Sequence, residues 1–324
     1  MARRERQPRA PRVGLVLGAG GIAGLAFHAG TLAALHHDTG WDPASADLVV
    51  GTSAGSIAGA MLRAGVSTED LAAWGSNVAP STNGLAHRPM LDRFAAGRPR
   101  LQLRPSWRPQ HAHLYRTLVG SRSFSAAAMS VLPHGVLDLS TAVGRVDVML
   151  PAWPERPLWL TAVRLASGRR VVFDGTRGVQ PHQAVAASCA IPFLSRPVDI
   201  DGRAHIDGGV HSPTNADLLC GADVDVAIVL APMAGWGRSR AGGPHDLIRR
   251  SATRHLAREC ELLRDAGIEV HTLVPDRRTS AAMGLNSLDR RRAPAILREA
   301  FLATGAQLSP EMRRSVGCRD SVVA

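Results

Sequence analysis

Ser53 is the residue of this chain whose surroundings best suit covalent chemistry. It stands in Gly51-Thr52-Ser53-Ala54-Gly55, between a short apolar run and small residues at helix-compatible spacing. This order predicts a strand, a sharp turn with the serine at its tip, and a helix that starts beneath it. The glycines leave room for a strained turn, and the helix N-terminus favours negative charge near the hydroxyl. The motif indicates a nucleophile, although an ordinary helix-capping serine fits the same pattern.

Asp207 is the candidate base for that serine. It follows two predicted strands, 198–200 and 204–206, which form a hairpin, and it precedes Gly208 and Gly209. A carboxylate next to two glycines has little steric cover, so the hydroxyl of a neighbouring serine can reach it. Asp-Gly is also common in plain turns, and that alternative stays open.

Two histidines, His205 and His211, flank Asp207 and raise the question of a metal site. Their offsets from the carboxylate match no spacing that is characteristic of zinc ligands. We therefore predict no metal and no cofactor.

A glycine-rich loop, Gly18-Ala19-Gly20-Gly21-Ile22-Ala23-Gly24, follows the predicted strand 13–17 and precedes the predicted helix 25–36. Glycines let a ligand oxygen approach the main chain closely, and the start of a helix adds positive potential. If this strand lies beside the one that ends at Ser53, the loop amides would form an oxyanion hole for a tetrahedral intermediate.

The same loop also fits a relaxed dinucleotide-binding fingerprint, G-x-G-x-x-A, over residues 18–23. That fingerprint needs an acidic residue at the end of the second strand, about 20 residues later. The available acids fit poorly, since Asp38 and Asp42 lie in a predicted turn and Asp47 begins its strand. Nucleotide binding is kept as an alternative.

Strands alternate with helices along most of the chain, which predicts an α/β fold with a mostly parallel sheet covered on both faces. The predicted strands are 13–17, the run before Ser53, 158–165, 170–173, 198–200, 204–206, 225–230 and 269–274. The predicted helices are 25–36, 54 to about 63, one starting at 67–70, 180–188, 244–266 and 290–304.

The chain shows no internal repeat and no clear linker, so we expect one domain over residues 12–305. A basic, disordered tail at 1–11 and a C-terminal tail at 306–324 flank it. Residues 80–133 break the pattern with Pro, Arg, His and Trp, and they predict a long irregular insertion of the kind that forms lids or binding loops.

The net charge of +11 comes from 38 arginines without a lysine, which is typical of codon bias and weakens the inference to nucleic acid. Only 4% of the residues are aromatic, and they do not alternate with basic residues as base-stacking surfaces do. We predict no nucleic-acid partner. A basic surface still suits transient contact with an anionic membrane.

The expected location is the cytoplasm, with at most peripheral membrane contact. The apolar stretch 13–35 has five glycines in its first half, so it is a poor signal peptide or membrane anchor. The cysteines lie too far apart for a metal motif or a disulfide scaffold. They are Cys189, Cys220, Cys260 and Cys318.

Taken in order, these motifs resemble the patatin-like phospholipases, over about residues 12–232. The resemblance rests on the glycine loop, the Ser53 motif, Ser188–Pro192, Asp207-Gly208-Gly209 and the segment 212–217. It implies a three-layer patatin-like α/β fold and a lipid acyl hydrolase of the phospholipase A or lysophospholipase type, with a lipid or lysophospholipid substrate.

The resemblance also implies roles for individual residues. Ser53 would be the nucleophile that forms an acyl-enzyme, and Asp207 would be its base in a Ser-Asp dyad. The oxyanion hole would be formed by Gly20, Gly21 and Ile22. The supporting glycines would be Gly18, Gly24, Gly51, Gly55, Gly208 and Gly209.

One position departs from the family pattern. Family loops commonly carry Arg or Lys where this chain has Ala23, so charge assistance to an oxyanion or a lipid phosphate is in doubt. Two other function classes stay open. One is an α/β-hydrolase esterase with a Ser-Asp-His triad, which would need His255 or His271. The other is a lipid- or nucleotide-binding protein with weak or no turnover.

Overall fold

The computed structural model describes residues 10–76, 100–101, 137–138, 146, 150–192, 194–235 and 244–316. Apart from 100–101, the predicted insertion at 80–133 lies outside these residues, as does most of the predicted tail at 1–11. The strands are β1 (Val13–Leu17), β2 (Leu48–Thr52), β3 (Arg100–Leu101), β4 (Leu137–Asp138), β5 (Leu158–Arg164), β6 (Arg170–Phe173), β7 (Val198–Ile200), β8 (Arg203–Asp207), β9 (Val226–Leu230) and β10 (Glu269–Leu273). The helices are α1 (Gly21–Thr39), α2 (Ala54–Arg63), α3 (Thr68–Gly75), α9 (Pro181–Ser188), α10 (Pro244–Asp265), α11 (Arg277–Met283), α12 (Ala293–Gln307) and α13 (Pro310–Ser315), with short 3-10 turns that include η5 (Arg290–Arg292).

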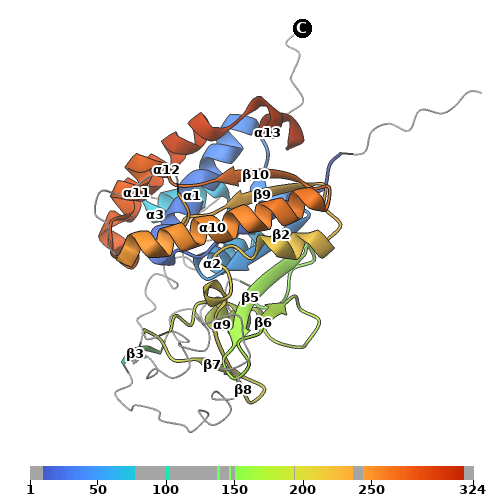
Figure 1. The fold of residues 1–324 in the computed structure, drawn as a ribbon, viewed down its shortest axis with the longest axis vertical. Coiled ribbons are helices and arrows are strands. Elements are labelled where there is room, and N and C mark those ends of the chain that lie inside the picture. Colours follow the sequence, from blue (N-terminus) through green and yellow to red (C-terminus); the bar gives the residue numbers. More distant parts are fainter. Residues whose placement is uncertain are drawn as a thin grey trace, which may run out of the picture.

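Eight strands of the described chain form one sheet, with the order β10-β9-β1-β2-β5-β8-β7 and with β6 also paired to β5. The strands from β10 to β5 run parallel, whereas β8 and β6 run antiparallel to β5, and β7 runs antiparallel to β8. In Figure 1 the sheet continues from β10 near the top to β7 and β8 near the bottom. The predicted α/β class with a mostly parallel sheet is confirmed.

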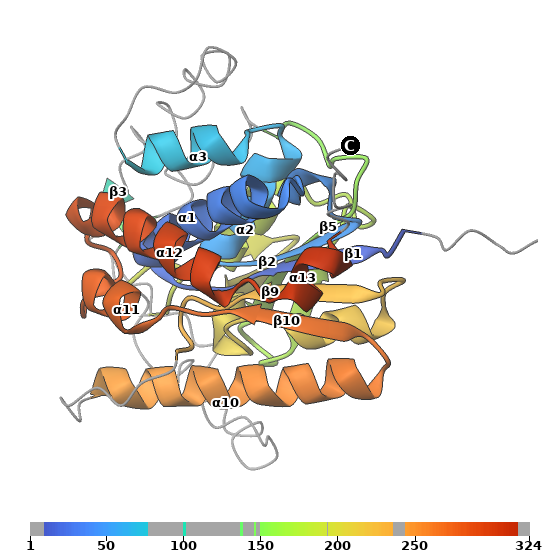
Figure 2. The ribbon, with the colours of Figure 1, turned by 90° about the horizontal axis from the view of Figure 1, so that it is seen from above.

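Helices cover both faces of this sheet (Figure 2). The helices α1, α2, α3 and α12 lie on one face, and α10 lies on the other. The strand residues alternate to match, because successive side chains of a strand point to opposite faces. Leu15 and Leu17 of β1 pack into the core beneath α1, whereas Val16 packs with Leu256 and Leu263 of α10. The central strands β1, β2 and β9 are therefore buried on both sides.

The predicted glycine loop is shorter than expected, because α1 begins at Gly21 rather than at residue 25. Glycine disfavours a helix by propensity alone, so the sequence argued against a helix there. Tertiary packing overrides that preference. A Cβ on Gly30, for example, would overlap the Leu297 carbonyl, so glycine lets α12 pack directly on α1.

Two helices in the C-terminal part were not predicted, α11 and α13. Both start at side-chain caps, since the Asp276 carboxylate accepts from Thr279 N–H and the Ser309 hydroxyl accepts from Met312 N–H. Helix α13 lies inside the segment 306–324 that the sequence assigned to a tail, and its Met312 is buried. Among the helices that the structure describes, none combines the length and the apolar character that a bilayer crossing requires.

The sheet register brings the candidate residues to one place. Leu17 at the end of β1 pairs with Gly51 of β2, so the glycine loop and Ser53 leave the sheet side by side. Strand β2 pairs with the first half of β5, and β8 pairs with the second half, where Ala162 is opposite Asp207. The ends of β2 and β8 therefore meet at the middle of β5.

Candidate active site

Ser53 occupies a backbone conformation that few non-glycine residues adopt. Its φ is 54° and its ψ is −116°, between the end of β2 and the first residue of α2. A Cβ on Gly51 would lie 2.7 Å from Ser56 Cα, and a Cβ on Gly55 would overlap the Leu17 carbonyl. Both positions therefore need glycine, as the motif predicts for a strand–turn–helix elbow.

Hydrogen bonds hold this strained turn on both sides of the peptide. The Ser53 N–H donates to Ser188 Oγ at 2.8 Å. The Ser53 carbonyl accepts from Ser56 Oγ at 2.6 Å and from Cys189 Sγ at 3.4 Å. Strain of this kind persists only where the surroundings over-determine the conformation. The end of α9, which carries Ser188 and Cys189, thus clamps the elbow.

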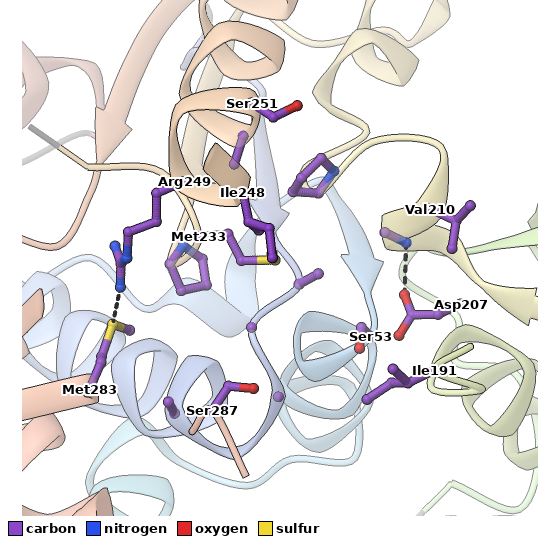
Figure 3. Close-up of a pocket in the computed structure, with 18 of the residues that line it drawn as sticks. Ser53, Ile191, Asp207, Val210, Met233, Ile248, Arg249, Ser251, Met283 and Ser287 are labelled. Carbon is purple, nitrogen blue, oxygen red and sulfur yellow. Dashed lines mark hydrogen bonds between the residues drawn. The ribbon is translucent and has the colours of Figure 1, made fainter. Parts of the chain in front are cut away.

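Asp207 lies at the end of β8, and Figure 3 shows its carboxylate facing Ser53. The residue is 6% exposed, and its Oδ1 accepts from Gly209 N–H at 2.7 Å. Burial raises the pKa of Asp207 from 3.8 to about 6, against the opposing effect of hydrogen bonds from the Ser53 hydroxyl and the Gly209 N–H. A carboxylate with a raised pKa is a stronger base than an exposed one, and here it faces a serine hydroxyl.

A buried polar network ties the Asp207 loop to the strand before Ser53. Asn215 is fully buried, and its Nδ2 donates to Ser212 O at 2.6 Å and to Thr52 Oγ1 at 3.1 Å. The Thr52 hydroxyl in turn lies 2.8 Å from the Thr161 hydroxyl. Sequence reasoning assigned these side chains no role, because the contacts join segments that are far apart in the chain. The signal available was that Asn215 belongs to the segment 212–217, which resembles the family.

Two charged side chains brace this network from outside. Arg170 Nη1 donates to Asn215 Oδ1 at 3.2 Å, and the same guanidinium forms a two-point pair with Asp217 at 2.6 and 2.8 Å. Glu259 of α10 is buried and accepts from Ala216 N–H at 3.0 Å. Burial raises the pKa of Glu259 as well. Glu259 is thus another buried carboxylate besides Asp207.

Some amides of the glycine loop donate hydrogen bonds to neighbouring segments, whereas others lie at the start of helix α1. Gly18 N–H donates to Leu230 O at 3.0 Å, and Ala19 N–H donates to Pro213 O at 2.7 Å. Amides in the first turn of a helix have no acceptor one turn back, so they can bind an anion. At the start of α1 these are Gly20, Gly21 and Ile22.

The supporting glycines differ in how strictly they are needed. A Cβ on Gly208 would overlap Thr161, and a Cβ on Gly209 would lie 3.0 Å from Asp207 Oδ1. At Gly24 the nearest approach would be an ordinary contact of 3.4 Å. A Cβ on Gly18 would lie 3.0 Å from Leu230 O. Steric demand is therefore strong at every supporting glycine except Gly24.

Ala23, the position where the family pattern has a cation, is 3% exposed. Its N–H donates to Ser287 O at 2.9 Å, so the segment that follows α11 lies directly against the glycine loop. Arg249 of α10 is a cation that does line the pocket, from the opposite side.

A pocket of about 550 Å³ opens in front of Ser53 and Asp207 (Figure 3). That volume suits a small-molecule or acyl-chain ligand. Its inner wall is formed by the glycine loop, Ser53 and Asp207, and its outer wall by α10 and residues 283–287. Apolar side chains are prominent in the lining, among them Ile191, Val210, Met233, Ile248, Met283 and Leu285.

The histidines divide between the pocket and the rest of the fold. His211 and His255 line the pocket, and burial lowers the pKa of both. His271 lies on the edge strand β10, where its Nε2 contacts Glu269 at 2.9 Å. His205 is buried against the Phe173 ring, at 5.6 Å between centroids. Only His255 of the two triad candidates therefore lines the described pocket.

Other parts of the described chain bear on the metal and nucleotide alternatives. No group of three His, Cys, Asp or Glu residues there is placed to hold a metal ion. Asp47 precedes β2, and its Oδ2 accepts from Val13 N–H at 2.7 Å. This carboxylate lies at the start of β2, whereas a dinucleotide fingerprint needs an acid at the strand's other end.

Comparison with known proteins gives a family match and distant relatives. A model of the family described as patatin-like phospholipase matches residues 15–219. An uncharacterized NTE family protein of Mycobacterium tuberculosis is 29% identical over 234 residues, which are 71% of this chain and 51% of that protein, and its Mycobacterium bovis counterpart matches equally. The chain thus spans about half the length of the curated relatives it matches.

Among solved structures, VipD from Legionella pneumophila aligns with a TM-score of 0.44 and 14% identity, over 93% of this chain and 67% of that one. The type III effector protein ExoU aligns with a TM-score of 0.38 and 15% identity, over 95% of this chain and 54% of that one.

Proposed function

Because the chain belongs to the patatin-like phospholipase family, we propose that it is a serine hydrolase that cleaves carboxylic esters of lipids, with Ser53 as nucleophile and Asp207 as base. One observation carries this proposal. The strained Ser53 and the buried carboxylate of Asp207 face each other at the wall of a largely apolar pocket. The family supports lipid acyl hydrolysis in general, and the residue roles and the substrate class are our inference.

The first step is attack by the serine. Asp207 accepts the proton of the Ser53 hydroxyl while the Ser53 oxygen adds to the ester carbonyl carbon. The pKa of Asp207, raised to about 6, brings the base closer to neutral pH than an exposed aspartate would be. The fixed elbow keeps the hydroxyl beside the carboxylate, so little motion is needed before the attack.

The tetrahedral intermediate then carries a negative oxygen. The amides of Gly20, Gly21 and Ile22 are the donors that we assign to this oxygen, and the α1 dipole adds to their effect. The intermediate collapses when Asp207 returns its proton to the leaving alcohol. An acyl-Ser53 ester remains, and a water molecule, activated by the same carboxylate, releases the fatty acid.

The lining of the pocket supports an apolar acyl group as the part of the substrate that is bound. Ala23 lies where a cation would otherwise stand beside the glycine loop, so the loop itself offers backbone dipoles and no side-chain charge. We therefore propose that the ester and its acyl chain are recognised at the glycine loop. Any phosphate of the substrate would be bound farther out.

A triad is the second candidate, and one observation favours it. His255 lines the same pocket, and burial with nearby Arg258 and Arg254 lowers its pKa, so its imidazole is neutral at pH 7. A neutral imidazole can act as a base. Asp207 has the stronger case, because its carboxylate faces the Ser53 side chain (Figure 3) and its pKa is influenced by that hydroxyl.

Product analysis with lysophosphatidylcholine in oxygen-18 water tests the proposal. We expect free fatty acid and glycerophosphocholine, with one labelled oxygen in the fatty acid carboxylate, because water attacks the acyl-enzyme. A chelator in the assay should change nothing. Release of phosphocholine, or the absence of fatty acid from this substrate and from a short aryl ester, would overturn the proposal.

A further inference from the structure

Large apolar side chains that face solvent are few in the described part of the chain. Those that are more than half exposed are Ile248, Leu262, Leu285 and Leu302, at 53%, 52%, 81% and 61%. Two of them, Ile248 on α10 and Leu285 after α11, also line the pocket in front of Ser53. We call this pair the lip. Half of the exposed apolar residues are thus gathered at one opening.

Hydrogen bonds and packing hold the backbone of the segment that carries Leu285. The Ser287 carbonyl accepts from Ala23 N–H at 2.9 Å, which fastens the segment of Leu285 to the glycine loop. The Arg292 guanidinium lies against Gly284, whose φ is 65°, and its Nη1 donates to Ala282 O at 3.1 Å. Leu285 therefore stands at the outer edge of a segment fixed to the candidate oxyanion hole.

The segments that carry the lip also carry positive charge. The exposed arginines of α10 are Arg250, Arg254, Arg258 and Arg264, and those of η5 are Arg290, Arg291 and Arg292, of which the last two pair with Asp289. Exposed apolar residues on segments that also carry arginines match an anionic bilayer surface, where side chains enter the acyl boundary and guanidinium groups remain at the phosphates.

We propose that the lip inserts into the surface of an anionic lipid bilayer and thereby seals the pocket against it. A lipid could then pass from the bilayer to Ser53 without exposing its acyl chain to water. The inference rests on the proposed function for the identity of the substrate. It differs from the sequence expectation, which placed membrane contact generally on a basic surface.

Vesicle binding in a Ser53→Ala background tests the inference without turnover, so its outcome is independent of whether the protein hydrolyses lipid. The vesicles contain phosphatidylcholine and phosphatidylglycerol in equal parts, with pure phosphatidylcholine as the comparison. Ile248→Ser and Leu285→Ser change the lip without changing charge. Leu262→Ser, on the same helix as Ile248, and Leu302→Ser remove apolar groups that are also more than half exposed but do not line the pocket.

We expect each lip substitution to weaken binding to the anionic vesicles about fivefold and the double substitution about twentyfold, since each partly inserted aliphatic chain adds to the affinity. The two control variants should bind within about twofold of the parent. Added salt and pure phosphatidylcholine should both weaken binding of the parent. Thermal unfolding of every variant verifies that the fold is retained.

A second readout does not depend on loss of binding. Tryptophan at position 285, introduced by Leu285→Trp, should be quenched by brominated acyl chains, whereas Leu302→Trp should not, after subtraction of the parent signal. Equal losses in lip and control variants, or failure of the parent to bind anionic vesicles, would overturn the proposal. So would a protein dimer that the lip substitutions dissociate, because the lip would then cover a second copy.

Discussion

The inner wall of the pocket carries backbone amides, glycines and a buried carboxylate, whereas the outer wall includes aliphatic side chains that reach solvent. Ser53 and Asp207 are 4% and 6% exposed, but Ile248 and Leu285 are 53% and 81% exposed. The inner wall comes from within residues 15–219, the part that matches the family, while α10 and the segment after α11 come from beyond it.

The difference shows where the molecule tolerates change. A methyl group added at Gly55 or Gly208 would overlap backbone atoms, and the Asn215 network leaves little freedom around the elbow. On the outer wall, Leu285 meets solvent on most of its surface. We infer that the chemistry depends on the inner wall, whereas the choice of lipid and the contact with its surface depend on the outer wall.

The largest difference in rate should appear between variants of two serines that line opposite walls of the pocket. Ser53→Ala should lower kcat on a short aryl ester about ten-thousandfold or more, since loss of the nucleophile removes the covalent route. Ser251→Ala, on the outer wall, should stay within about threefold, because a single neutral contact contributes little. Initial rates of the purified variants, with thermal unfolding as a check of the fold, measure both. A folded Ser53→Ala protein with the parent's rate would contradict the nucleophile assignment.

Two buried carboxylates give the next comparison. Asp207→Asn should lower kcat/KM about a hundredfold to a thousandfold, because the amide keeps the shape but cannot accept the serine proton. Glu259→Gln removes a carboxylate whose pKa is also raised by burial, yet this side chain only braces the Ala216 segment. Its loss should cost less than about tenfold, as expected for a residue that does not touch the reacting atoms. Equal losses of kcat/KM in the two variants would contradict the assignment of Asp207 as the base and of Glu259 as a structural residue.

Histidine substitutions should have small effects. His255→Ala and His271→Ala are each expected to keep kcat/KM within about fivefold of the parent, far from the hundredfold or larger loss of a general base. His271 lies on the edge strand, and it serves as the control for the pocket-lining His255. Steady-state rates at neutral pH suffice. A hundredfold loss confined to His255→Ala would favour the triad and make Asp207 an orienting group.

The remaining prediction concerns stability rather than rate. Folding raises the pKa of Asp207 from 3.8 to about 6, so the folded state binds a proton more tightly than the unfolded state does. The resulting penalty is absent below about pH 4, grows as the pH rises to about 6, and is complete above it, at about 2–3 kcal/mol. Asp207→Asn should therefore be more stable than the parent at pH 8 and equally stable at pH 4. Denaturant unfolding at the two pH values measures this, and a gain that does not vary with pH would contradict the burial argument.

The sequence predicted the local structure around Ser53 and Asp207, because local patterns specify it. A strand that runs into Gly-x-Ser-x-Gly favours a strand–turn–helix elbow, and the hairpin before Asp207 has a strong turn signal at Asp201-Gly202. Both residues of that turn have positive φ, which such a turn requires. The sheet order that places Asp207 beside Ser53 depends on pairing across β5, and the resemblance implied it where periodicity could not.

The outer wall was not predicted. Helix α10 was expected over nearly its observed range, but its amphipathic pattern does not say which residues border a pocket. The segment after α11 has no periodicity, and its contact with Ala23 joins parts of the chain that are far apart in sequence. Ala23 itself was noted as a departure from the family pattern. That Ser287 lies over this position became visible only in three dimensions.

The pH dependence of labelling by a fluorophosphonate tests the Ser53–Asp207 pair most directly, because this reagent reacts only with an activated serine. The adduct, mapped by peptide mass spectrometry, should lie on Ser53. The labelling rate should rise with pH up to about 6, where the Asp207 carboxylate becomes ionised, and stay level above it. In Asp207→Asn the rate should be low and flat across this range. An adduct on another serine, or a midpoint that survives Asp207→Asn and disappears in His255→Ala, would contradict the dyad.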